Sequence, residues 1–117
     1  MEEGWKGGRS VKRVGQVIKV RPEKLEEYKR LHAAVWPEVL EATRERHIRN
    51  YSIFHKDGYL FAYLEYVGDD YASDMKALDA DERCQKWEEV CRACHEPLET
   101  RAKGEWWADM EEVFHCD

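Results

Sequence analysis

The first patterned segment of the chain, residues 11–20 (VKRVGQVIKV), is rich in β-branched residues, which favour strands. Side chains of a strand point to alternate faces, so Val14, Ile18 and Val20 share one face. Pro22 follows directly, and proline suits the first turn of a helix. The segment is therefore predicted to be a β-strand that leads into a helix.

A helical pattern follows over residues 23–46, where apolar or aromatic side chains recur mostly three or four positions apart. The positions on this stripe are Leu25, Tyr28, His32, Val35, Val39 and Leu40. Trp36 precedes Pro37, and the residue before a proline is pushed away from helical backbone angles. We therefore expect a helix that is kinked or broken at this dipeptide.

Two strands are predicted over residues 48–56 and 59–67, joined by Asp57-Gly58, a strong signal for a two-residue hairpin. The second segment, YLFAYLEYV, is apolar on both of its faces. A sheet covered on one side only usually alternates apolar with polar residues. We therefore expect both faces of this strand to be buried, one by helices and the other by a second subunit.

The second half of the chain is predicted to hold two helices, over residues 69–79 and 81–99, and a last strand over 109–115. The longer helix carries an apolar stripe made of Cys84, Trp87, Cys91, Cys94 and Leu98. The resulting order is strand, helix, strand, strand, helix, strand. This order is typical of the ferredoxin-like arrangement in the α+β class, which hosts many unrelated functions.

The composition fits one globular domain over residues 11–117. Hydrophobic residues make up 43% and charged residues 38% of the 117, a balance that excludes a disordered chain. The apolar runs fall well short of the roughly 20 residues that cross a bilayer. The net charge is −6 and no basic stripe occurs. Nucleic acid and membrane are therefore not expected as partners.

Residues 1–10 are predicted to form a flexible tail. They hold three glycines and lack the apolar stretch of a secretion signal. The expected compartment is therefore the cytoplasm, where the four cysteines stay reduced.

The string Cys91-Arg92-Ala93-Cys94-His95 matches the motif for covalent haem attachment. That attachment requires export, for which the sequence offers no signal. A structural zinc site needs two further ligands at regular spacing, which are missing. Neither haem nor a metal is expected, and the cysteines are predicted to pack as small apolar residues.

Tyr28 and His32 are the leading candidates for chemistry. They are four residues apart on the inward stripe of the first helix, so their side chains are neighbours. A histidine titrates near neutral pH and transfers protons. A core histidine that only satisfies a buried hydrogen bond fits the same pattern, and the spacing alone leaves both interpretations open.

Four strings of the sequence occur in a specific order. They are Glu27-Tyr28-Lys29-Arg30-Leu31-His32 with Val35-Trp36-Pro37-Glu38, then Asn50-Tyr51-Ser52-Ile53-Phe54, then Cys84-Gln85-Lys86-Trp87, and last Glu111-Glu112-Val113-Phe114. Together they resemble the L-rhamnose mutarotase family over about residues 11–116. The spacing Y-x-x-x-H-x-x-x-W-P-E is the most specific element.

The resemblance implies a cytoplasmic homodimer of the dimeric α+β barrel type. It implies an enzyme that interconverts the α and β anomers of the monosaccharide L-rhamnose without cofactor or metal. The family's proton-donor histidine falls on His32, and its sugar-contacting tyrosines fall on Tyr28 and Tyr51. The candidates for the base that acts with His32 are Tyr28, Tyr51, a water, or a carboxylate such as Glu88.

The chain departs from the family at its tandem tryptophan pair, which falls on Trp87 and Glu88. Both positions are expected to contact the sugar, with a carboxylate that accepts a hydrogen bond where an indole would pack. Trp106 and Trp107 follow Gly104 in a loop. They are possible sugar-contacting residues that would supply the aromatic surface of the missing tryptophan, or they form a hydrophobic plug over the end of the core.

Two other functions fit the same fold. One is a non-catalytic binding module, since many small ferredoxin-like domains bind partners. The other is a monooxygenase of the dimeric α+β barrel type that acts on an aromatic or haem substrate. A non-catalytic binding module, however, would have no reason to place Tyr28 and His32 on the inward stripe of the helix.

Overall fold

The central strand of the sheet is β1, whose two edges pair with different parts of the chain. The computed structural model describes residues 10–117. Its strands are β1 (Lys12–Val20), β2 (Ile48–Lys56), β3 (Tyr59–Tyr66), β4 (His95–Glu96) and β5 (Ala108–Met110). The order is β2-β3-β1-β4, all antiparallel, with β5 beside β4 on the same edge of β1. This is the predicted ferredoxin-like order.

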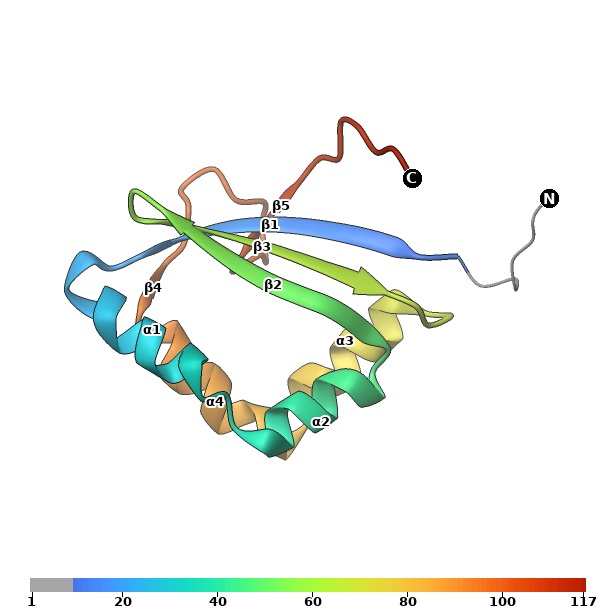
Figure 1. Ribbon diagram of the computed structural model, residues 1–117, viewed down its shortest axis with the longest axis horizontal. Helices are drawn as coiled ribbons and strands as arrows, with labels where there is room; N and C mark the ends of the chain where they lie inside the picture. Colours follow the sequence, from blue (N-terminus) through green and yellow to red (C-terminus); the bar gives the residue numbers. More distant parts are fainter. Residues whose placement is uncertain (1–9) are drawn as a thin grey trace.

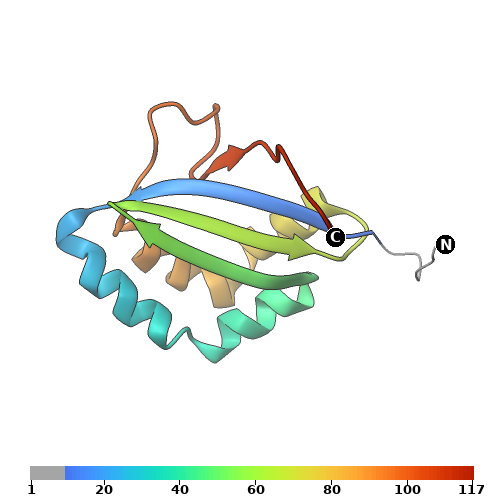
Figure 2. The ribbon, with the colours of Figure 1, turned by 45° about the horizontal axis from the view of Figure 1, so that its top comes forward.

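The helices lie together on one side of this sheet (Figures 1 and 2). They are the short 3-10 helix η1 (Pro22–Lys24) and the α-helices α1 (Leu25–Ala33), α2 (Pro37–Glu45), α3 (Tyr71–Ala80) and α4 (Glu82–Arg92). The break between α1 and α2 is confirmed, because Trp36 has an extended backbone with ψ of 132°. No helix within residues 10–117 has the length and apolar character of a bilayer crossing.

The hairpin between β2 and β3 is also confirmed. Asp57 and Gly58 both have positive φ, 52° and 86°, as a two-residue turn that matches strand twist requires. The tail predicted over residues 1–10 lies, apart from Ser10, outside the described residues.

Two predicted boundaries are wrong. α4 ends at Arg92 instead of continuing to residue 99, because His95 and Glu96 pair with the end of β1 as β4. The last strand covers Ala108–Met110 instead of 109–115. Val113 and Phe114, which fall within the predicted strand, are 87% and 79% exposed and belong to neither core cluster of residues 10–117.

The main core lies between the sheet and the helices. Ile18, Leu60 and Cys94 are almost inaccessible to solvent, and Trp87 and Tyr28 pack in the same cluster. A smaller cluster under α3 is made of Ile48, Leu64 and Tyr66. Both faces of β3 were predicted to be buried. Within residues 10–117, only the face towards the helices is buried.

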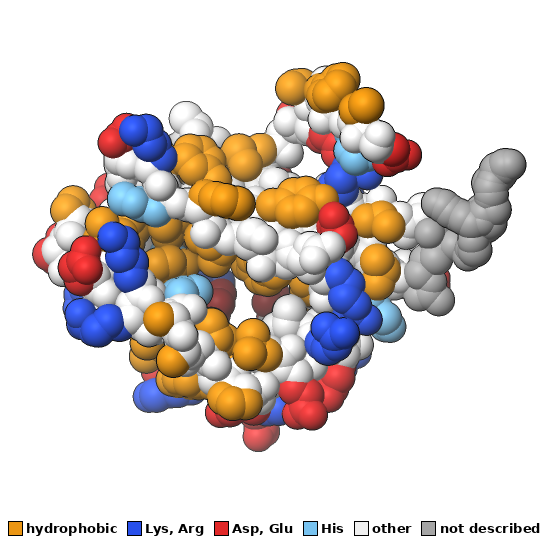
Figure 3. All heavy atoms as spheres, viewed as in Figure 1, with side chains coloured by type: hydrophobic (Ala, Val, Ile, Leu, Met, Phe, Trp, Pro, Cys, Tyr) orange, Lys and Arg blue, Asp and Glu red, His pale blue; other side chains and the backbone are white. Residues whose placement is uncertain are grey.

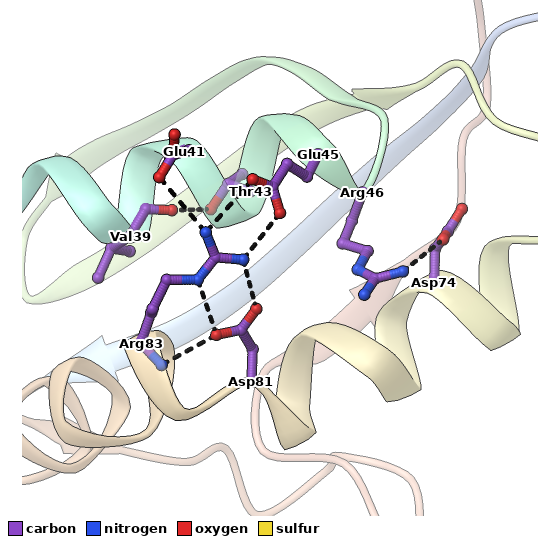
Figure 4. A network of polar contacts seen from close by, with 8 residues as sticks. All are labelled: Val39, Glu41, Thr43, Glu45, Arg46, Asp74, Asp81 and Arg83. Carbon is purple, nitrogen blue, oxygen red and sulfur yellow. Dashed lines mark hydrogen bonds and ion pairs between the residues drawn. The ribbon is translucent and has the colours of Figure 1, made fainter.

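A network of polar contacts joins the ends of α2 and α4 (Figure 4). Arg83 near the start of α4 binds Asp81 at 2.7 Å and Glu45 of α2 at 2.8 Å. Hydrogen bonds from the Arg83 side chain and backbone lower the pKa of Asp81 to about 2. Asp81 also caps α4, so the same carboxylate fixes the start of the helix and its position beside α2.

The main core predicts a large effect of truncation at its centre. Ile18→Ala removes a fully buried side chain, and such changes cost about 2–5 kcal/mol of unfolding free energy. Val11→Ala is the control, because Val11 is 44% exposed. Urea denaturation of both variants measures the difference. Equal midpoints for Ile18→Ala and the wild type would contradict this core.

Candidate functional site

A cleft of about 1580 Å³ opens between the sheet and the helix layer, and Figure 3 shows the hollow. Six of the seven predicted site residues line it: His32, Tyr51, Trp87, Glu88, Trp106 and Trp107. The seventh, Tyr28, is buried beside His32. The cleft is larger than the roughly 300–1,000 Å³ of typical small-molecule pockets. The size of the cleft therefore does not show where a ligand binds, and the arrangement of the lining side chains has to be considered.

His32 and Tyr28 meet on the inward side of α1. Their rings stack with centroids 4.1 Å apart. His32 Nδ1 lies 2.9 Å from the backbone oxygen of Tyr28. A carbonyl oxygen only accepts hydrogen bonds, so Nδ1 carries the proton and Nε2 of the neutral ring has a free lone pair. Within residues 10–117, Nε2 has no hydrogen-bond partner.

Burial keeps His32 in this neutral form. Desolvation lowers its pKa below the ordinary 6.5, although the hydrogen bond to the Tyr28 carbonyl opposes the shift. The Trp87 ring meets the imidazole edge to face at 5.2 Å, and Trp36 meets Trp87 at the same distance. The imidazole thus stands between a tyrosine and a tryptophan and presents a basic nitrogen.

A β-bulge turns Tyr51 towards the helix side of the sheet. Arg49 pairs with Glu65 and Ser52 with Tyr63, so two residues of β2 oppose one residue of β3. The bulge contains Asn50 at φ 52°, a conformation that asparagine tolerates. The Tyr51 side chain lines the cleft and is 46% exposed overall. Desolvation, aided by the Glu88 carboxylate, raises its pKa to about 12.

Glu88 lies on the exposed side of α4, one residue after the buried Trp87. Arg92, one turn later, donates a hydrogen bond from Nε to its carboxylate at 3.3 Å. The Arg92 guanidinium also lies 4.7 Å above the Trp106 ring. These contacts join Glu88 to the loop that carries the tandem tryptophans.

His95 is a buried neighbour of the candidate site residues that the sequence did not reveal. It is 3% exposed, with Nε2 3.2 Å from the Tyr28 hydroxyl and Nδ1 3.1 Å from the Trp106 indole nitrogen. The Trp107 ring lies 5.3 Å away. Desolvation lowers the pKa of His95 to about 4. In the sequence, His95 stands out only as the last residue of the haem-like string, and 67 positions separate it from Tyr28.

Residues 10–117 hold no group of three or more His, Cys, Asp or Glu arranged to bind a metal ion. Cys91 and Cys94 are buried free thiols, as the apolar stripe predicted. Desolvation raises the pKa of Cys91 to about 12, so its thiolate, the form that binds metals, is disfavoured.

The arrangement suits proton transfer to a ligand with several hydroxyl groups. His32 supplies a basic nitrogen, and the two tyrosines supply hydrogen-bond donors. Burial raises the pKa of Tyr28 well above its ordinary value, as it does for Tyr51, so both phenols stay protonated. As protonated phenols, both are hydrogen-bond donors.

Comparisons with known proteins agree with one another. The family model described as L-rhamnose mutarotase matches residues 13–116. An L-rhamnose mutarotase of Bacillus subtilis is 36% identical over 110 residues, which cover 92% of this chain and all of the relative. One from Lactiplantibacillus plantarum is 33% identical and covers 90% and 98% of the two chains.

A solved structure shares the fold. The L-rhamnose mutarotase from Formosa agariphila is 23% identical and superimposes with a TM-score of 0.67, covering 91% of this chain and 99% of that one. The family match spans nearly all of the described residues, including His32, Tyr28 and the bulge at Tyr51. The chain belongs to the L-rhamnose mutarotase family.

Proposed function

We propose that the protein interconverts the α and β anomers of L-rhamnose, with His32 as the group that moves the proton. Family membership supports the reaction. The observation that carries the role of His32 is its neutral imidazole, whose Nδ1 is held by a carbonyl and whose Nε2 has no partner among residues 10–117. His32 also lines the cleft, beside an aromatic wall.

Anomers exchange when the pyranose ring opens and closes again. The anomeric hydroxyl gives its proton to His32 Nε2 and becomes the aldehyde oxygen, while the bond from C1 to the ring oxygen breaks and leaves its electron pair on that oxygen. The imidazolium then gives the proton to the ring oxygen. The aldehyde rotates and closes from its other face by the reverse steps. General acid–base catalysis of this kind contributes about 10²–10⁴-fold.

His32 is in this scheme both the base and the proton donor, so no second base is required. Tyr28 and Tyr51 remain protonated and donate hydrogen bonds to sugar oxygens. Trp87 offers an apolar surface to the methyl side of the sugar. Glu88 accepts a hydrogen bond from a sugar hydroxyl at a position where the family has tryptophan.

The role of His32 predicts a loss of exchange in His32→Ala. The variant should exchange anomers at least about 100-fold more slowly than the wild type, because the acid–base group is gone. Proton NMR saturation transfer between the anomeric signals of L-rhamnose measures this rate. Lys76→Ala, which truncates an exposed residue of α3 that does not line the cleft, should keep full activity. Full activity of His32→Ala would remove His32 from the mechanism.

The lowered pKa of His32 predicts the pH dependence. The neutral ring is the active form at the start of the reaction, so kcat/KM should be constant near neutral pH and fall as the pH drops through a value below 6.5. Saturation transfer over a pH series gives this midpoint. A rise in kcat/KM below pH 6.5 would instead make the imidazolium the starting form.

A homodimer belongs to the same proposal and is supported by the uncovered side of the sheet, here called the outer face. Apolar side chains on this face are at least one-third exposed: Phe54, Tyr59, Phe61 and Met110. The exposed Val113 and Phe114 lie in the C-terminal segment beyond β5. Exposed apolar surfaces of this kind mark interaction sites, and a second copy would supply the second covered face.

The dimer proposal predicts that a charge on the outer face separates the subunits. Phe61→Glu should shift the molar mass in light-scattering chromatography from dimer to monomer, because a carboxylate would be buried without a partner. Lys76→Glu, on the exposed side of α3, is the control and should stay dimeric. A wild-type protein that is monomeric at all concentrations would rule the dimer out.

A further inference from the structure

A chain of hydrogen bonds runs from the loop before β5 to α1. The Trp106 indole nitrogen lies 3.1 Å from His95 Nδ1, and His95 Nε2 lies 3.2 Å from the Tyr28 hydroxyl. His95 and Tyr28 are 3% and 4% exposed, and Trp106 lines the cleft. Three distant parts of the sequence are therefore joined by two consecutive hydrogen bonds.

The indole determines where His95 carries its proton. An indole nitrogen always donates and never accepts a hydrogen bond. His95 Nδ1 must therefore accept from Trp106 and carries no proton. In a neutral imidazole the proton is then on Nε2, which donates to the Tyr28 oxygen. A doubly protonated ring would set an N–H of His95 against the N–H of Trp106.

The Tyr28 hydroxyl proton is left without a place on His95. The phenol oxygen already accepts from Nε2, which has no lone pair in this tautomer, so the O–H bond must point elsewhere. No other hydrogen-bond partner of this hydroxyl lies within residues 10–117. The phenol ring stacks on His32, which lines the cleft, and Tyr28 and His32 together line a smaller pocket of about 120 Å³.

The opposite tautomer would have the opposite effect. With the proton on Nδ1, the Trp106 N–H would lose its acceptor. Nε2 would then accept a hydrogen bond from the Tyr28 hydroxyl. Tyr28 would then offer a ligand its oxygen lone pairs in place of a proton. The indole N–H of Trp106 thus determines whether Tyr28 offers a ligand a hydrogen-bond donor or an acceptor.

We propose that His95, locked by Trp106 in the tautomer with its proton on Nε2, positions Tyr28 as a hydrogen-bond donor to an oxygen of the bound sugar. His95 is a positioning residue, because it touches Tyr28 and not the substrate. The contact with the sugar rests on the proposed function. The tautomer itself does not, since it follows from the three side chains alone.

Nitrogen-15 NMR of the histidine side chains tests the tautomer directly. At neutral pH, His95 should show a protonated Nε2 and an unprotonated Nδ1, and its signals are assigned by their loss in His95→Gln. Trp106→Phe keeps a ring but removes the donor, so the His95 signals should shift towards the other tautomer. A proton found on Nδ1 in the wild type would overturn the proposal.

Kinetics tests what the tautomer does for the reaction. The glutamine amide places an acceptor and a donor nearly as far apart as the two ring nitrogens, so His95→Gln should keep kcat/KM within about twofold. His95→Leu and Trp106→Phe should each lower kcat/KM about three- to tenfold, the worth of one hydrogen bond. Both losses should vanish in a Tyr28→Phe background, because the coupled group is absent.

Losses that persist undiminished beside Tyr28→Phe would overturn the proposal, since His95 would then act by packing alone. Circular dichroism of each variant identifies any that fails to fold, and Trp106→Phe gives a second route if His95→Leu does so. A wild-type protein without mutarotation would end the proposed function, while the NMR experiment would still decide how His95 directs Tyr28.

Discussion

The shape of the protein depends on one proline. Pro37 has no backbone N–H and pushes Trp36 into an extended conformation, so the segment from Leu25 to Glu45 cannot form a single straight helix. α1 places Tyr28 in the main core, whereas α2 turns away towards the N-terminal end of α4, where Arg83 holds it. The cleft lies between this bent pair of helices and the sheet.

The cleft also requires polar groups in a small core, where each must find a partner. Tyr28, His95 and Trp106 meet this requirement together, since each phenol, imidazole or indole group there bonds to the next. His32 uses a backbone carbonyl instead. The two histidines therefore have opposite tautomers: Nδ1 carries the proton in His32 and Nε2 carries it in His95. One ring is left with a basic nitrogen for chemistry, and the other has both nitrogens engaged.

Local chemistry made much of this architecture predictable. Asp57-Gly58 specifies a turn, Trp36-Pro37 specifies a break, and the spacing of Tyr28 and His32 makes them neighbours on any helix. The end of α4 was not predictable in this way, because the pairing of His95 with Val20 is a contact between distant segments. The contact of His95 with Tyr28 likewise left no periodic signal. The inward turn of Tyr51 depends on a bulge. The sequence marks this bulge only by Asn50, a residue type that tolerates the positive φ found there.

The departure at Glu88 involves more than one side chain. Its carboxylate is bound by Arg92, and the same guanidinium covers one face of Trp106. The edge of Trp106 that carries the N–H is bound to His95. Trp106 is therefore not free to replace the missing tryptophan with that face or that edge. In the proposed function, a sugar at this wall would meet a paired carboxylate and guanidinium in place of a flat indole, and both groups form hydrogen bonds with hydroxyls. Recognition at this position would then rest on hydrogen bonding in place of apolar contact, beside His32 as the proposed proton-transfer group.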